Sequence, residues 1–163
     1  GNSGETSNLL FYYLAHHTKL DSFEKRGEKG KLYVIADEKQ VMINDRHIKD
    51  FIGDAQPLGD LSFGGIAADL TKTWDVTILL INNYSAQMQR SEQFYAELFG
   101  PDNVIVVQDA DTIPETIAAL FALDMGRDVA SVTTDLAATA GKEVANRVGA
   151  TLEQRSGKVG ALR

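Results

Sequence analysis

The stretch Asp75-Val-Thr-Ile-Leu-Leu-Ile-Asn82 decides the fold. Its apolar residues follow one another almost without interruption, which is typical of a parallel strand that is covered on both faces. Two further runs have the same character, Leu32-Tyr-Val-Ile-Ala36 and Val104-Ile-Val-Val107. We therefore expect the three runs to form one parallel sheet, in the spatial order in which the chain presents them.

Helical patterns surround these three runs. Apolar residues recur at helical spacing near residues 6–18, 45–52, 60–73, 85–99 and 112–125. Asp60 is the expected N-cap of the third of these segments. A chain that alternates strands and helices in this way needs right-handed crossovers. The sequence thus predicts an α/β fold with a parallel Rossmann-like sheet and helices on both faces.

The segment 127–163 differs from the rest of the chain. It is rich in Ala, Thr, Gly and Ser, has few large apolar residues, and shows an Ala-rich helical pattern at 133–154. From residue 142 onward its formal charge is +3, from Lys142, Arg147, Arg155, Lys158 and Arg163 against Glu143 and Glu153. We expect this segment to be an appendage, helical or mobile, that contacts a partner.

The composition excludes several classes of function. The formal net charge of −7 lacks the basic footprint of a nucleic-acid-binding protein. No apolar run approaches the roughly 20 residues that cross a bilayer, so we expect no membrane segment and a location in the cytoplasm or in a soluble assembly. The absence of cysteine removes disulfides and thiolate zinc sites. A protein partner or a metal ion fits this composition better.

Motifs of the common enzyme classes are missing from the sequence. There is no Gly-x-Ser-x-Gly elbow and no Walker phosphate loop. His16 and His17 are neighbours on a helix and point in different directions, which favours packing or surface roles. An α/β fold by itself supplies no chemistry. We therefore expect no catalytic residues and no enzymatic activity.

Five blocks of the first 126 residues resemble, in the same order, the second half of von Willebrand factor A-like (vWA) domains. These blocks are Gly1-Asn-Ser-Gly-Glu-Thr6, Leu14-Ala-His-His-Thr18, Glu24-Lys-Arg-Gly27, Tyr33-Val-Ile-Ala-Asp-Glu38 and Gly100-Pro-Asp-Asn-Val-Ile105. The resemblance implies that residues 1–126 supply strands 4 to 6 of the usual six, followed by the tail at 127–163. The start at Gly1, without Met, fits a processed or truncated chain.

The resemblance also implies a metal-ion-dependent adhesion site (MIDAS) at the carboxyl ends of the strands, usually for Mg²⁺. This chain matches two of the three loops that build the site in the family. Asp37 matches the third loop, and Ser3, Glu5 and Thr6 lie in the second. Such oxygen ligands suit a hard divalent cation, which a partner's carboxylate then completes. The alternative for Asp37 is a solvated strand end.

The first MIDAS loop, Asp-x-Ser-x-Ser, has one partial look-alike in the chain. Asp60-Leu-Ser-Phe-Gly64 has Gly in place of the second Ser and follows no buried strand. Helix capping explains it better. Because two loops cannot complete an oxygen shell, we expect Mg²⁺ to bind weakly or not at all to this chain alone.

Two functions remain open. The first is a protein-binding module, for adhesion or as an adaptor, that engages its partner with or without a divalent ion. The second is a structural subunit that docks into neighbouring chains and keeps only a vestigial metal site. In both, the strand at 32–36 is not expected to be a free edge. It would be covered by the N-terminal remainder of the vWA domain, by another chain or by the tail after Asp128.

Overall fold

The computed structural model describes the backbone of residues 5–82 and 87–160 and the side chains of residues 5–82 and 87–153. Its sheet has three strands, β1 (Gly30–Ala36), β2 (Trp74–Ile81) and β3 (Val104–Val107), in the order β1-β2-β3. Both pairings are parallel. The parallel sheet and its strand order, expected from three apolar runs, are therefore confirmed.

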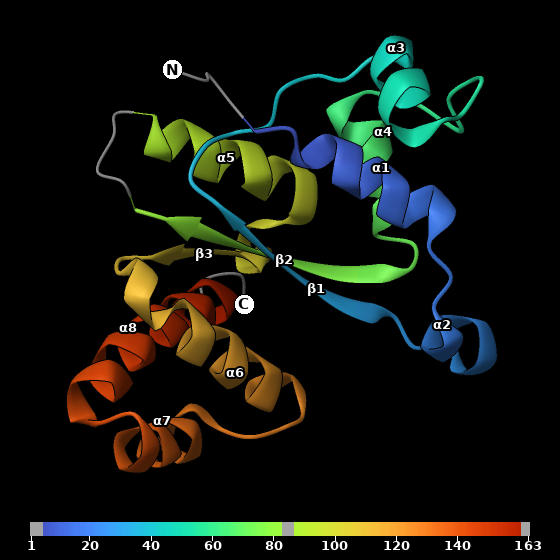
Figure 1. Cartoon of the computed structure of the whole chain (residues 1–163). Coiled ribbons are helices and arrows are strands. Elements are labelled where there is room, and N and C mark those ends of the chain that lie inside the picture. The colour runs from blue at the N-terminus through green and yellow to red at the C-terminus, as the bar shows by residue number, and fades with distance from the viewer. Residues whose placement is uncertain (1–4, 83–86, 161–163) are drawn as a thin grey trace.

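Helices α1 (Ser7–His17), α4 (Phe63–Leu70) and α5 (Met88–Phe99) cover the first face of the sheet (Figure 1). Ile78 and Leu80 of β2 point to this face, where they pack in one core cluster with Phe11 and Tyr95. The N-cap of helix α4 is Ser62, whose hydroxyl accepts a hydrogen bond from Gly65 N at 3.1 Å. The expected N-cap, Asp60, is therefore wrong.

Helices α6 (Ile113–Asp124) and α8 (Lys142–Gly160) cover the second face, and α7 (Val129–Thr139) packs against these two helices on the side away from the sheet (Figure 1). Leu79 of β2 points to this side and packs with Val132, Val148 and Leu152. Of the two expectations for the tail, helical or mobile, the structure shows a helical tail. The expectation that it is an appendage is wrong, because three of its side chains belong to the core.

Gly141 divides the tail into two helices where the sequence suggested one at 133–154. Its φ of +94° is a left-handed conformation that ends α7 and that side chains other than glycine adopt rarely. The two helices then pack closely, since a Cβ added at Gly149 would lie 3.2 Å from Thr133. Small residues therefore allow α7 and α8 to pack closely, although the segment has few large apolar side chains.

Short elements fill the connections between the larger ones. The expected helix at 45–52 is present as α3 (Asp45–His47), which continues into a π-helical turn, η1 (Ile48–Ile52). Helix α2 (Asp21–Arg26), which the polar sequence did not suggest, ends at Gly27. Two 3-10 turns, η2 (Pro101–Asn103) and η3 (Ala110–Thr112), flank β3.

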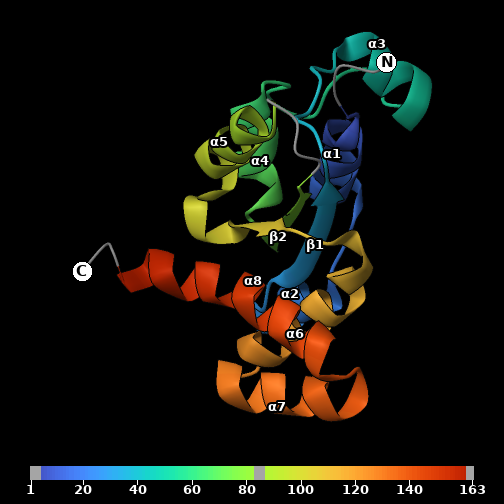
Figure 2. The same ribbon diagram turned by 90° about the vertical axis from the view of Figure 1, so that its left-hand side faces the viewer.

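Strand β1 lies at one edge of the sheet, and over the described residues its only strand partner is β2. Large apolar side chains near it are exposed, with 48% of Ile35 and 51% of Leu10 open to solvent. Helices α7 and α8 lie below the sheet, and α8 contacts β3 rather than this edge (Figure 2). Among the helices that the structure describes, none is long and apolar enough to cross a membrane.

Candidate functional site

The carboxyl end of β1 meets the segment that leads into α1. Glu5 pairs with Gln40 as a single parallel bridge, in which Glu5 N donates to Lys39 O at 3.1 Å and Val41 N donates to Glu5 O at 2.8 Å. The buried side chain of Asn8 adds a third bond, from Nδ2 to Val41 O at 3.0 Å. These bonds hold Glu5 beside the strand end.

Three carboxylates gather at this strand end. Partial burial raises the pKa of Glu5, and the neighbouring carboxylates of Asp37 and Glu38 raise it further. Beneath them lies the fully buried Tyr95, whose hydroxyl donates to Glu38 O at 2.9 Å. Burial and then the charge of Glu5 raise the pKa of Tyr95. The site is therefore a place where added positive charge would be stabilised.

Gln40, the partner of Glu5 in this bridge, is buried, with 2% of its surface exposed. Neither atom of its side-chain amide has a hydrogen-bond partner among the residues that the structure describes. A buried polar group without a partner costs free energy comparable to a lost hydrogen bond. The strand end thus combines crowded carboxylates with an amide that has hydrogen-bonding capacity to spare.

The structure brings together two of the four residues expected to bind a metal ion. Glu5 and Asp37 are close enough to shift the pKa of Glu5. Thr6 precedes α1 and is exposed, and its side chain does not cap that helix. Ser3 lies outside the described residues. Over the described parts of the chain, no group of three or more His, Cys, Asp or Glu could hold a metal ion.

These donors fit a hard cation in kind, because carboxylate, hydroxyl and amide oxygens are the ligands of Mg²⁺. They do not complete an oxygen shell within the described residues. Glu5, Thr6 and Asp37 would hold part of such an ion's coordination sphere, and the remaining positions would come from elsewhere.

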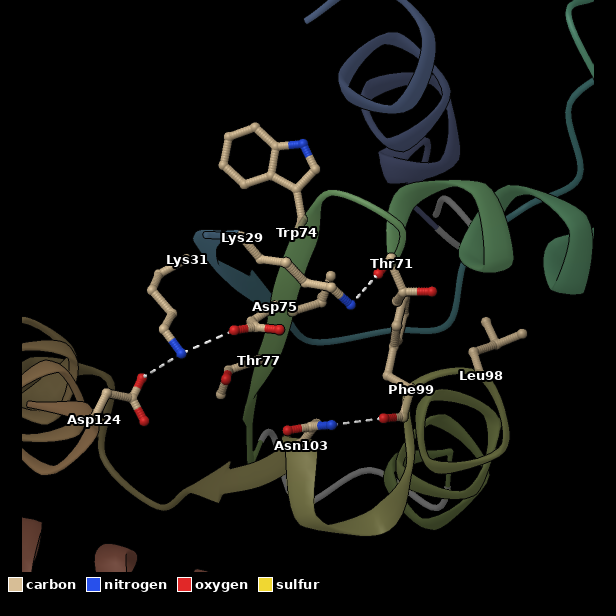
Figure 3. Close-up of a pocket in the computed structure, with 11 residues that line it drawn as sticks. Lys29, Lys31, Thr71, Trp74, Asp75, Thr77, Leu98, Phe99, Asn103 and Asp124 are labelled. Carbon is tan, nitrogen blue, oxygen red and sulfur yellow. Dashed lines mark hydrogen bonds and ion pairs between the residues drawn. The ribbon is translucent and has the colours of Figure 1, made fainter. Parts of the chain in front are cut away.

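A second polar region lies at the opposite, amino end of the strands (Figure 3). It is a cavity of about 490 Å³. Lys31 Nζ lies 3.0 Å from Asp75 Oδ2 and 3.4 Å from Asp124 Oδ2, and Lys29 Nζ donates to Thr71 O at 2.6 Å. Burial lowers the pKa of Lys31, but the two carboxylates outweigh it and raise the pKa overall.

Sequence reasoning missed this cavity because its charges come from the start of β1, the start of β2 and the end of α6. No local motif joins Lys31, Asp75 and Asp124. Parallel α/β sheets bind ligands outside the carboxyl ends of their strands. In the amino-end cavity, the carboxylates of Asp75 and Asp124 already pair with Lys31. We therefore take the carboxyl end as the candidate site.

His16 and His17 contact different carboxylates, as expected of neighbours on a helix. His17 Nε2 lies 2.9 Å from Asp54 Oδ2, and His16 Nε2 lies 3.4 Å from Asp69 Oδ2. The hydroxyl of the buried Tyr12 also donates to Asp54, at 2.7 Å. That bond is the first cause of the lowered pKa of Asp54. These contacts hold the segment after η1 and the end of α4 against α1.

Fold and site together define a parallel α/β protein with an acidic cluster at the carboxyl edge of its sheet. Comparison of the chain with models of known protein families, with curated proteins and with solved structures found no match.

Proposed function

We propose that this chain is a protein-binding module of vWA type, used for adhesion or as an adaptor. Its contact surface is the set of loops at the carboxyl ends of the strands. It binds with or without a divalent ion such as Mg²⁺, held by Glu5, Thr6 and Asp37. The observation that carries the proposal is that Glu5 of the segment before α1 lies beside Asp37 and Glu38 at the end of β1, where burial and then these two carboxylates raise the pKa of Glu5.

The sheet supports this proposal through its order. The resemblance to vWA domains requires strands 4 to 6 to pair in parallel and in sequence, and β1, β2 and β3 do so. The acidic cluster also lies at the edge of the sheet where parallel α/β proteins bind their ligands. Both observations agree with a binding surface at the carboxyl end.

A structural subunit is the second candidate function, and the edge of β1 favours it. Leu10 and Tyr13 of α1, Ile35 of β1 and Phe121 of α6 are large, apolar and at least 46% exposed. Helix α6 lies near this strand, since its Asp124 reaches Tyr33 and Lys31. Exposed apolar surface beside a sheet edge marks a contact site. The N-terminal remainder of the vWA domain or a neighbouring subunit would cover it.

Titration of the ¹⁵N-labelled 163-residue chain with Mg²⁺, followed by NMR, tests the proposal. We expect binding weaker than micromolar, with shifts centred on Glu5, Thr6 and Asp37. Asp37→Ala should remove these shifts, while the control Asp124→Ala at the amino end should keep them. Micromolar binding that survives Asp37→Ala would contradict the ligand assignment. A complete lack of shifts would favour the structural subunit with a vestigial site.

A further inference from the structure

An apolar groove lies beside the acidic cluster. It has a volume of about 330 Å³ and is lined by Leu9 of α1 and by Val41, Met42, Ile43, His47 and Phe51. Small-molecule pockets span roughly 300–1,000 Å³, and this groove lies at the lower end of that range. Its size therefore suits one or two side chains better than a larger cofactor. Because most of its lining side chains are apolar, the groove favours an apolar occupant.

The walls of the groove are preformed. Val41 is fixed to the start of α1 by its bonds with Glu5 and Asn8. On the other wall, Asn44 and His47 form a reciprocal capping box, with His47 N donating to Asn44 Oδ1 at 3.2 Å. The His47 ring stacks on Phe51, with ring centroids 6.4 Å apart. A preformed groove binds a ligand with little loss of conformational entropy.

The rim of the groove leaves apolar surface in water. Met42, in the segment between the Glu5–Gln40 bridge and α3, is 65% exposed, and Phe51 of η1 is 70% exposed. Aromatic and methionine side chains are enriched at protein interfaces, and methionine adapts to different partners. The rim therefore has the chemistry of a contact surface for another polypeptide.

One end of the groove adjoins the acidic cluster. Thr6, which lines the groove, follows Glu5 directly, and Val41 is bonded to the backbone of Glu5. Glu5 in turn faces the carboxylates of Asp37 and Glu38. An occupant of the groove thus has its neighbouring residue next to concentrated negative charge. Charge complementarity then favours a basic residue at that position.

We propose that this groove receives an apolar side chain from a partner protein, and that an adjacent lysine or arginine of the partner contacts Glu5 and Asp37. The inference rests on the proposed function, because it names the chemistry of the partner that this surface binds. A second copy of the chain fits less well, since each copy carries a formal charge of −7. Mg²⁺ at Glu5 and Asp37 competes with the partner's basic residue.

Three capped dipeptides test the proposal by ¹⁵N NMR at millimolar concentration: acetyl-Leu-Arg-amide, acetyl-Leu-Glu-amide and acetyl-Ala-Arg-amide. We expect the Leu-Arg probe to shift the amides of residues 5–9 and 41–51. The Leu-Glu and Ala-Arg probes should each bind more weakly, with a Kd at least about three times larger. Addition of Mg²⁺ should weaken binding of the Leu-Arg probe.

The exposed Phe51 and the half-buried Glu5 supply variants that test the two parts of the surface. Phe51→Ser should weaken the Leu-Arg probe about tenfold, as loss of an aromatic interface residue commonly does. Glu5→Gln should remove the preference for Leu-Arg over Leu-Glu. Phe121→Ser changes the same residue type at another exposed position, on α6. It is the matched control and should change neither.

Each contrary result has a distinct meaning. Equal binding of the Leu-Arg and Leu-Glu probes, or no shift along the groove, would overturn the inference. If Mg²⁺ still shifted Glu5 and Asp37 in that case, the proposed function would stand. Stronger binding of the Leu-Glu probe with Mg²⁺ would overturn the basic partner in favour of an ion completed by a carboxylate. Concentration-dependent shifts of the groove without any probe would show that a second copy occupies it.

Discussion

The two ends of the sheet treat their carboxylates in opposite ways. At the amino end, Lys31 lies between Asp75 and Asp124, and these carboxylates raise its pKa (Figure 3). At the carboxyl end, Glu5 lies against Asp37 and Glu38, and its own pKa is raised after burial by their charge. One end thus satisfies its charges internally. The other concentrates negative charge, which a positively charged ligand would stabilise.

This difference is what a division between stability and function would produce. Functional sites commonly retain arrangements that lower stability, because binding requires groups that the fold itself leaves unsatisfied. In a parallel sheet the loops after the strands converge at one edge. The segment before α1 reaches that same edge and adds Glu5 to it.

The largest expected effect concerns packing at the amino end. A Cβ added at Gly30 would lie 2.8 Å from the ring of Trp74 and 2.9 Å from Leu20. Gly30→Ala should therefore lower the free energy of unfolding by about 1–3 kcal/mol, the usual cost of overpacking, measured by urea denaturation. Gly64→Ala is the control, because nothing lies near that position on α4. It should be neutral or stabilising by up to about 1 kcal/mol.

An intermediate effect is expected beneath the acidic cluster. Tyr95→Phe removes the hydroxyl that donates to Glu38 O and leaves that carbonyl without this donor. The free energy of unfolding should fall by about 1–2 kcal/mol, as for a lost buried hydrogen bond. Tyr33→Phe removes a hydroxyl 3.3 Å from Asp124 at the exposed amino end. A change above roughly 0.5 kcal/mol there would mean that the two ends are not as different as their geometry indicates.

The smallest effects should have opposite signs at the two ends. Glu5→Gln removes a carboxylate from among like charges and should raise the free energy of unfolding at pH 7 by up to about 1 kcal/mol. Asp124→Asn removes a partner of Lys31 and should lower it by a similar amount, the range for partly exposed charge pairs. Thermal or urea unfolding of both variants measures this contrast. The same sign for both would remove the proposed difference between the ends.

The pH dependence of Glu5→Gln sharpens the comparison. Since the pKa of Glu5 is higher in the folded chain than the ordinary glutamate value of 4.5, the folded state binds more protons between the two values. The free energy of unfolding therefore falls as pH rises through this window. The stabilisation by Glu5→Gln should be present at neutral pH and should disappear below the usual pKa of glutamate. An advantage that persisted in acid would point to a cause other than charge.

The sequence by itself determined the parallel sheet, its order and most helices. Apolar runs such as 76–81 have one stable environment, a strand covered on both faces, and this holds whatever the rest of the chain does. It also indicated, through the resemblance to vWA domains, that Glu5 and Asp37 belong to one site. The structure places Glu5 and Asp37 close together, and their role as a metal site stays a prediction.

Only the tertiary structure decided the role of the tail, the cap of α4 and the charge network at the amino end. Val132, Val148 and Leu152 are buried because α7 and α8 approach closely through small residues. The composition of this segment indicated only that it is weakly apolar. Lys31, Asp75 and Asp124 meet across the ends of three elements. Local patterns report what each residue prefers, whereas contacts between distant segments depend on how the elements pack.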